Sequence, residues 1–463
     1  MRQALAFCTL MLAAVPAFAS GLNGAELPVT WALPFLGILL CIALCPLLVP
    51  HFWHLHFGKV AVFWACLCIV PLFMLKGPDV AVHSLAHAML GDYIPFIIFV
   101  GTLFIVAGGI HIKSSFVGTP LVNAAILLLG AFFANIMGTT GAAMLLIRPL
   151  LQANKDRKHV THTFIFFIFL VANVGGCLTP LGDPPLFLGF LRGVDFFWTA
   201  SHLFIPMVTV TAIILAIYLA FDYHFWRKED HSKMVVAKEP FRIEGKVNIL
   251  LLFGVVGAVL MSGLWDSGVT YTILGVHFTM QSILRDICFV LISEASLLLT
   301  AKAVRHANRF TWDPILEVAK LFFGIFACIV PVLEMLRAGH AGVFAPLVSL
   351  VSNADGSLNN DMFFWLAGSL SAFLDNAPTY LAFFNLAGGD PVHLMGEGYK
   401  TLMAISMGSV FMGAMSYIGN APNFMTVAIV KERGIPMPSF FGYMVWSVGI
   451  LAPSFFIVTM IFL

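Results

Sequence analysis

Charged residues are scarce in this chain. Only 10% of its 463 residues are Asp, Glu, Lys or Arg, whereas 60% are hydrophobic, and the formal net charge is +1. Ordinary globular domains contain about 25% charged residues, so this composition excludes a soluble domain. The near-zero net charge leaves no basic surface for nucleic acid. The composition therefore predicts an all-α polytopic membrane protein whose first partner is the lipid bilayer.

The sequence also lacks the residue sets that enzymes and metal centres use. Its eight cysteines all lie in apolar stretches, and Cys66 and Cys68 have no nearby His or Cys pair to complete a metal site. The expected spans contain no nucleophile–base pair. We therefore expect buried free thiols, no cofactor and no enzymatic activity.

The first residues have the pattern of a cleavable signal. Arg2 precedes an apolar run from Ala4 to Val15 that is too short to span, and Ala17-Phe18-Ala19 forms an A-x-A-like cleavage site. We therefore expect residues 1–19 to be removed, leaving a periplasmic N-terminus on a protein of the inner membrane. An uncleaved anchor is the alternative.

Apolar stretches near the ~20 residues that a helical span requires recur along the rest of the chain. Two of them, 160–192 and 399–431, are too long for one straight helix, and 119–152 and 360–388 have the length and the central break of re-entrant hairpins. The pattern predicts about ten spans, including two broken crossover helices, together with two hairpins. The continuous spans are expected at 28–49, 58–75, 93–112, 199–224, 247–265, 283–301, 315–337 and 440–462.

Four small polar clusters interrupt these apolar stretches. Backbone that leaves helical geometry at membrane depth is tolerated only where protein or a water-filled cavity satisfies it, so such breaks mark ion or substrate sites. Thr139 and Asp183, in the first two clusters, are 44 residues apart, and Asp375 and Asn420, in the last two, are 45 apart. This spacing predicts a duplicated transporter core. The clusters are 135–141, 179–185, 375–379 and 419–423.

The distribution of lysine and arginine sets the orientation. With an outside N-terminus, most cations fall on the inner side, as the positive-inside rule requires. The first hairpin then opens inside and the second outside, which makes the two halves an inverted repeat. The few outer cations are Lys76, Arg192, Arg285, Arg337 and Lys400. The expected units are a signal at 1–19, N-terminal helices at 20–90, a first repeat at 91–226, a cytoplasmic linker at 227–246 and a second repeat at 247–463.

The polar residues of the breaks could have either of two roles, helix capping or ion binding. Asp183, Asp375 and Asn420 each stand at a helix start, where they could simply cap free backbone N–H groups. An ionised carboxylate in mid-membrane nevertheless costs at least about 2.5–3.5 kcal/mol, which favours a role in binding Na⁺ or a proton. Glu294, near the middle of its span, is a candidate proton relay or a partner for a neighbouring helix. The candidate ion or substrate residues are Asn135, Thr139, Thr140, Thr179, Gly182, Asp183, Asp375, Asn376, Thr379, Asn420 and Asn423.

At these residues the chain resembles the ion transporter superfamily, which includes NhaD-type sodium/proton antiporters and carriers of arsenite, citrate and divalent anions. Residues 179–183, Thr-Pro-Leu-Gly-Asp, resemble the crossover of the NhaD group, and 371–378 resemble its second hairpin. The first hairpin lacks that group's Asp-Asn pair, and 419–423 is closer to citrate and arsenite carriers. The resemblance implies hairpins and crossover helices, a homodimer and elevator-like alternating access.

Two functions remain open at this point. In the first, Asp183 and Asp375 bind either Na⁺ or protons, giving sodium/proton antiport. In the second, an oxygen cage holds a cation while hairpin-end N–H groups hold citrate or another small carboxylate. The two acids would repel a multivalent anion and no Lys or Arg lies in the four clusters. We therefore rank antiport first and cation-coupled carboxylate transport second.

Overall fold

A computed structural model describes residues 22–113, 116–230 and 241–463. The expected signal at 1–19 lies outside these ranges. The described chain is almost entirely helical, and eight of its helices are long and apolar enough to cross a membrane. The predicted all-α polytopic membrane fold is therefore confirmed. The eight helices are Val29–Leu48, Pro50–Lys76, Pro78–Ala107, Pro120–Ala153, Trp198–Trp226, Val247–Leu264, Asp313–Arg337 and Phe440–Phe462.

The first half of the chain builds three helical stretches before its hairpin. The third stretch joins two α-helices through a π-helical segment that contains Asp92. The elements are η1 (Gly24–Glu26), η2 (Val29–Ala32), α2 (Leu33–Leu48), α3 (Pro50–Lys76), α4 (Pro78–Ala86), η3 (His87–Tyr93) and α5 (Ile94–Ala107).

The helix α6 (Pro120–Ala153) is the predicted first hairpin. Gly138 breaks it with φ 77° and ψ 154°, a backbone conformation with positive φ that glycine adopts without steric cost. The two ends of the element lie together, because the Gly118 N–H donates to the Ala153 carbonyl at 2.7 Å and the Asn123 amide donates to Asn154 at 2.9 Å. The chain therefore enters and leaves on one side.

A broken helix follows the hairpin, as predicted for 160–192. It consists of α7 (Thr161–Leu170), the short η4 (Val174–Cys177) and α8 (Pro184–Leu191), after which α9 (Trp198–Trp226) crosses back. Every residue of α7 from His162 to Leu170 is buried, so this half-helix is surrounded by protein rather than lipid. The unwound backbone between α7 and α8 is thereby kept away from the membrane hydrocarbon.

The second half repeats this order: two helices, a third that packs on the hairpin, the hairpin itself, a broken helix and a final helix. Its hairpin consists of α15 and α16, and its broken helix of α18, η7 and α19. The elements are α10 (Val247–Leu264), α11 (Met280–Leu299), α12 (Lys302–Ala307), α13 (Asp313–Arg337), η6 (Gly339–Ala341), α14 (Ala345–Leu350), α15 (Asn360–Ser371), α16 (Asn376–Leu386), α17 (Pro391–Met395), α18 (Tyr399–Phe411), η7 (Met412–Met415), α19 (Ala421–Glu432) and α20 (Phe440–Phe462).

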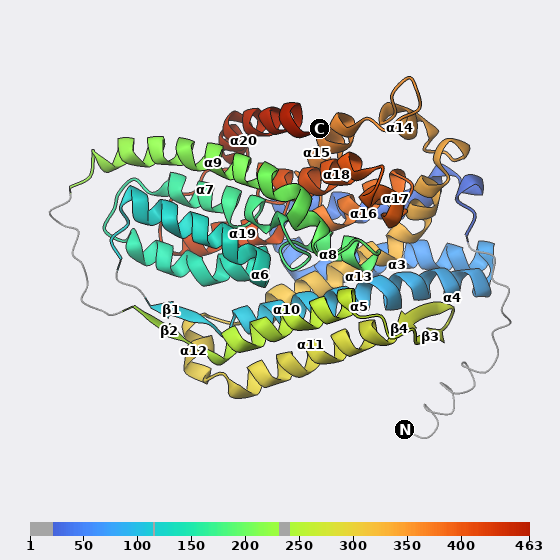
Figure 1. Ribbon diagram of the computed structural model, residues 1–463, viewed down its shortest axis with the longest axis horizontal. Coiled ribbons are helices and arrows are strands. Elements are labelled where there is room, and N and C mark those ends of the chain that lie inside the picture. Colours follow the sequence, from blue (N-terminus) through green and yellow to red (C-terminus); the bar gives the residue numbers. More distant parts are fainter. Residues whose placement is uncertain (1–21, 114–115, 231–240) are drawn as a thin grey trace.

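The two halves interlock symmetrically. Helix α3 packs along α13, and its counterpart α11 packs along α5. In Figure 1, α3, α4, α5, α10, α11 and α13 lie along one side of the molecule, while the hairpins and broken helices lie on the other. The contacts between these layers are also paired, since α5 packs on α6 and α13 packs on α16. The breaks therefore lie in the second layer, against the first.

The hairpins point in from opposite ends of the molecule. Figure 1 places α6 toward the end that holds β1, β2 and α12, and places α14 and α17, which flank the second hairpin, toward the end that holds β3, β4 and α4. This arrangement is the inverted repeat that the charge distribution predicted. The division of the first half at residue 90 stays a prediction.

Two short strand pairs were not predicted. Strand β1 (His111–Lys113) pairs antiparallel with β2 (Arg242–Glu244), and β3 (Thr270–Ile273) pairs with β4 (Val276–Thr279). Residues 242–244 lie in the segment expected to be a cytoplasmic linker, so the last part of that segment contains a short strand. Its role as a linker stays a prediction, and 231–240 lie outside the described residues. The Lys113 ammonium, 2.7 Å from Glu244, lowers the pKa of that carboxyl. The strand pair fixes the start of the second half to the end of α5.

Candidate functional site

The breaks from both halves converge on the carboxylate of Asp183. The Thr139 hydroxyl donates to its Oδ1 at 2.9 Å, the Asn376 amide donates to Oδ2 at 2.5 Å, and the Asn420 amide donates to Oδ1 at 3.3 Å. Asp183 is 1% exposed and its three partners are also buried. One residue from each predicted break therefore contributes to a single buried site.

Half-helices begin at each of these positions. Asp183 immediately precedes α8, Asn376 is the first residue of α16, Asn420 immediately precedes α19, and Thr139 opens the second part of α6 after the Gly138 break. The N-terminus of a helix carries free N–H groups and a partial positive charge, which favour negative groups. The site is thus a meeting point of helix N-termini from two repeats.

Close backbone contacts require glycine beside the site. A Cβ added to Gly182 would lie 2.0 Å from the carbonyl oxygen of Gly176, and one added to Gly419 would lie 2.6 Å from that of Gly413. The Thr139 N–H donates to the Gly182 carbonyl at 2.8 Å. Hairpin and broken helix can therefore join backbone to backbone at membrane depth only because no side chain intervenes.

A constant separation of 237 residues relates the two repeats. It joins Thr139 to Asn376 and Asp183 to Asn420, and it also joins Gly176 to Gly413 and Gly182 to Gly419. A hydrogen bond is repeated at the same separation: the Thr179 hydroxyl donates to the Asn135 carbonyl at 2.5 Å, and the Ser416 hydroxyl donates to the Ala372 carbonyl. The counterpart of Thr139 is thus Asn376 rather than Asp375, and both pairs of breaks are 44 residues apart.

Several predicted site residues hold the breaks together instead of facing the carboxylate. The Asn135 amide donates to Gly175 O at 2.5 Å and its oxygen accepts from the Leu178 N–H at 2.8 Å. Asn423 donates to Gly413 O and Ser416 O, and its oxygen accepts from Asn173 at 2.7 Å. These amides replace the hydrogen bonds that the unwound backbone gives up.

The remaining predicted residues lie at the edge of the cluster. The Thr379 hydroxyl donates to the Asp375 carbonyl at 2.9 Å, which is a bond within its own helical turn. Thr140 is only partly buried. Glu294 is exposed on α11, a helix that packs on α5 and α10, so the structure does not bring it to the breaks. A relay role for Glu294 stays a prediction.

Asp375 occupies a different position from Asp183. Its carboxylate accepts from the Ala377 N–H at 3.0 Å and so caps α16. The Asp183 hydrogen bonds come from Thr139, Asn376 and Asn420, whereas Asp375 is adjacent in the chain to one of these donors. The two acids therefore do not occupy equivalent positions, although the sequence placed them in matching breaks.

Cations near the breaks are engaged elsewhere. Arg192 pairs with Asp92 of η3 at 2.6 Å, and Arg148 donates to the Asn308 carbonyl at 2.5 Å. Within the described ranges, the hydrogen bonds to the Asp183 carboxylate come only from neutral donors. The negative charge of an ionised Asp183 is therefore left for a bound cation to balance.

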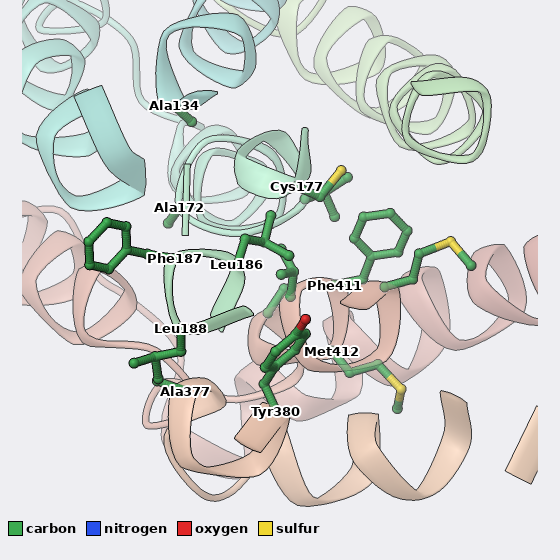
Figure 2. Close-up of a cluster of buried hydrophobic side chains, with 14 of the residues drawn as sticks. Ala134, Ala172, Cys177, Leu186, Phe187, Leu188, Ala377, Tyr380, Phe411 and Met412 are labelled. Atoms are coloured by element: carbon green, nitrogen blue, oxygen red, sulfur yellow. The ribbon is translucent and has the colours of Figure 1, made fainter. Parts of the chain in front are cut away.

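Apolar side chains enclose the site. Figure 2 shows Leu186, Phe187 and Leu188 of α8 beside Ala377 and Tyr380 of α16, with Phe411 and Met412 from the second broken helix. Phe187 also stacks on Phe99 of α5, with ring centroids 3.7 Å apart. These side chains are buried, and charges interact more strongly in such a low-dielectric surround than in water.

A second buried polar cluster was missed in the sequence. Asp222 of α9 pairs with Arg157 at 2.5 Å and with His162 at 2.9 Å, and it accepts from Tyr218 at 2.8 Å. The Asn123 amide also donates to it. Asp222 could have indicated this cluster from the sequence, because an acidic residue inside an apolar span needs a partner. The cluster joins the base of α6 to α7 and α9.

Metal and thiol expectations can be checked over the same described ranges. No group of three or more His, Cys, Asp or Glu residues there is arranged to hold a metal ion. The seven cysteines in these ranges are free, but only Cys68, Cys177 and Cys328 are buried. The expected burial is wrong for Cys66, which is exposed on α3, and Cys8 lies outside these ranges.

Comparison with known proteins gives the family. Residues 24–463 match the model of a family described as "putative citrate transport". Two relatives, each described as an uncharacterized transporter and found in Mycobacterium bovis and Mycobacterium tuberculosis, are 22% identical over 325 residues, which cover 69% of this chain and 72% of theirs. The family match spans nearly the whole chain, including both repeats and all four breaks. The chain therefore belongs to this family of membrane transporters.

Proposed function

We propose that the protein carries a small carboxylate, of which citrate is the first to test, across the inner membrane in a cation-coupled cycle. The observation that carries the proposal is the convergence of four half-helix N-termini and neutral amide and hydroxyl donors on one carboxylate. Helix N-termini favour an anionic substrate, while Asp183 favours a cation. A site with both features suits a substrate anion that enters with a positive ion.

This proposal reverses the ranking that the sequence favoured. Antiport was preferred because two acids were expected to share the site, but only Asp183 is held by the donors from the other breaks, and Asp375 caps α16. A carboxylate that is neutralised by a bound cation no longer repels a carboxylate substrate. The family description supports the same choice.

Sodium/proton antiport remains the second candidate function, because one observation favours it. The donors to Asp183 are neutral, so its charge could be balanced either by Na⁺ or by a proton, each displacing the other. The bound carboxylate substrate would then be unnecessary.

Transport in either case would proceed by alternating access, with the layer of hairpins and broken helices moving against the α3–α5 and α10–α13 layer. Interfaces that repeat symmetrically between the layers, α5 with α6 and α13 with α16, suit such a movement. We also propose a homodimer, as the resemblance implies.

The test is transport by purified protein in liposomes that contain a pH-sensitive dye. Labelled citrate uptake is measured with Na⁺, Li⁺, K⁺ or no added cation, and proton flux is recorded in parallel. Citrate uptake that needs a cation supports the proposal. Proton flux driven by Na⁺ or Li⁺ in the absence of citrate, with no citrate uptake, would establish antiport instead.

A further inference from the structure

The two repeats carry their acidic residues at different positions in the breaks. Thr139 and its counterpart Asn376 are both neutral donors to the central carboxylate, whereas Asp183 faces its own counterpart Asn420 across a 3.3 Å hydrogen bond. The paired backbone contacts around them are kept in both repeats. The backbone scaffold of the site is therefore symmetric, but the carboxylate that accepts from both repeats comes from the first repeat. The second repeat has its acid at Asp375, whose counterpart is Gly138, and Asp375 caps α16.

An unpartnered oxygen lies on one side of this charge. Asn376 is fully buried and its Oδ1 has no hydrogen-bond partner, although its Nδ2 donates to Asp183 at 2.5 Å. Since both atoms are bonded to one carbon, Oδ1 also lies close to the Asp183 carboxylate. A buried polar atom without a partner calls for an explanation. A cation bound between the two residues would use this oxygen, because hard cations prefer carboxylate and amide oxygens.

The opposite side is occupied by donors. The Asn420 amide donates to the Ala172 carbonyl at 3.1 Å, to Asn173 at 3.3 Å and to Asp183. These bonds hold Asn420 in place beside the free N-terminus of α19. A neutral amide next to a helix N-terminus leaves room for an anionic ligand beside it. A carboxylate at position 420 would repel such a ligand.

We propose that the difference between Asp183 and Asn420 divides the site: the cation binds beside Asp183 and the Asn376 amide oxygen, and Asn420 keeps the other half uncharged so that a substrate carboxylate can bind there. The second half of this statement rests on the proposed function, while the first does not. Asn420 is then the residue that permits an anionic substrate.

Cation binding is tested separately from transport, by the thermal stability of the detergent-purified protein as NaCl replaces choline chloride. A ligand that binds only the folded state raises the midpoint of unfolding. Wild type and Asn420→Asp should both be stabilised by Na⁺. Asp183→Asn and Asn376→Leu should lose the stabilisation. Ser447→Ala, which removes a buried hydroxyl that donates to the Met415 and Met444 carbonyls, should keep it. Na⁺ stabilisation that survives Asp183→Asn would overturn the assignment of the cation.

Substrate discrimination is tested by uptake of labelled citrate at saturating Na⁺. Asn420→Asp should lower uptake by about tenfold or more, since like charges would then face each other, while its Na⁺ stabilisation remains. Equal loss of both properties in Asn420→Asp would contradict the division of the site, and so would wild-type uptake. If Asn420→Asp does not fold, Asn420→Ser, which stays neutral, must keep uptake at more than half of wild type, or the proposal fails. Should wild type bind Na⁺ but take up no citrate, the proposed function fails and the cation assignment stands.

Discussion

Asp183 and Asp375 show how two similar residues acquire different roles through their neighbours. Both precede half-helices, but Asp183 accepts hydrogen bonds from three side chains that come from both repeats, whereas Asp375 accepts from the N–H of Ala377 two residues ahead. The first arrangement depends on the assembled core, and the second is local. We therefore expect their substitutions to differ.

Asp183→Asn should abolish cation-dependent transport while the protein still folds. Asparagine has nearly the same shape but loses the charge, and hydrogen bonds to charged groups are worth about 1.5–3 kcal/mol, or roughly 10- to 100-fold in rate or affinity. Asp375→Asn should keep the cap and retain a substantial part of the activity. Liposome uptake and size-exclusion chromatography measure the two effects. Equal loss of transport in both variants would restore the earlier view that the acids act as a pair.

Gly182→Ala should destabilise the site because its Cβ would lie 2.0 Å from the Gly176 carbonyl oxygen. That atom belongs to the backbone and cannot swing aside, so the cost should be at least the 1–3 kcal/mol typical of overpacking. The matched control is Gly449→Ala in α20, where an added Cβ meets nothing within 4 Å. The two variants are compared by thermal unfolding in detergent. If the unfolding midpoint of Gly182→Ala is as high as that of the control, the contact between Gly182 and the Gly176 carbonyl is not tightly packed.

At the scale of elements, the hairpins depend on what holds their bases as well as on their tips. The base of α6 is fixed by the Asp222 cluster, in which Arg157 and His162 are almost fully buried. The corresponding end of the second hairpin has the Asn385 side chain accepting from Arg337 at 2.6 Å. Each hairpin is thus joined by polar bonds to a neighbouring helix, although the bonds themselves are not repeated.

Asp222→Leu should destabilise the protein strongly, since removing one partner leaves buried Arg157 without its counter-charge. Breaking a buried pair in this way costs about 3–5 kcal/mol. The control is Glu244→Gln, which removes an exposed partner of Lys113 and should leave the unfolding midpoint close to wild type. Expression level and thermal unfolding would report both changes. An unaffected midpoint for Asp222→Leu would mean that the cluster does not hold the hairpin.

At the scale of the whole molecule, the distribution of Lys and Arg predicts an inner and an outer end, and the fold has two ends formed by different elements. The inner end is expected to carry α12, β1 and β2, and the outer end α14, β3 and β4, which lie at opposite ends in Figure 1. The orientation of this assembly in the membrane, and its location in the inner membrane, remain proposals.

Single cysteines can test that orientation in intact cells. In a background with the native cysteines replaced by serine, Ala354→Cys should react with an impermeant maleimide. Lys228→Cys should react only after permeabilisation, because it precedes the segment between the two halves. Both positions are exposed in the structure, so access depends on the membrane alone. Labelling of position 228 without labelling of 354 would reverse the orientation.

The sequence alone determined the membrane class, most of the spans and the position of every break. These features follow from local chemistry: apolar length sets a span, and Gly, Pro, Asn and Asp interrupt it. It did not reveal β1 and β2, because their pairing joins residues far apart in the chain. Helix α11 formed as predicted, although Arg285, Asp286 and Glu294 make it more polar than the eight apolar helices.

Only the tertiary structure decided which break residues share a site. Sequence spacing matched Asp375 with Thr139, and the fold showed that Asn376 takes that place, since the two repeats are related by 237 residues and meet at Asp183. Local pattern predicted a helix cap at both Asp183 and Asp375, but of the two only the Asp375 side chain accepts a capping hydrogen bond, and the Asp183 carboxylate is turned to the side chains of the other breaks. The contact between opposite hairpins depends on how two inverted halves interlock, and no local pattern specifies that geometry.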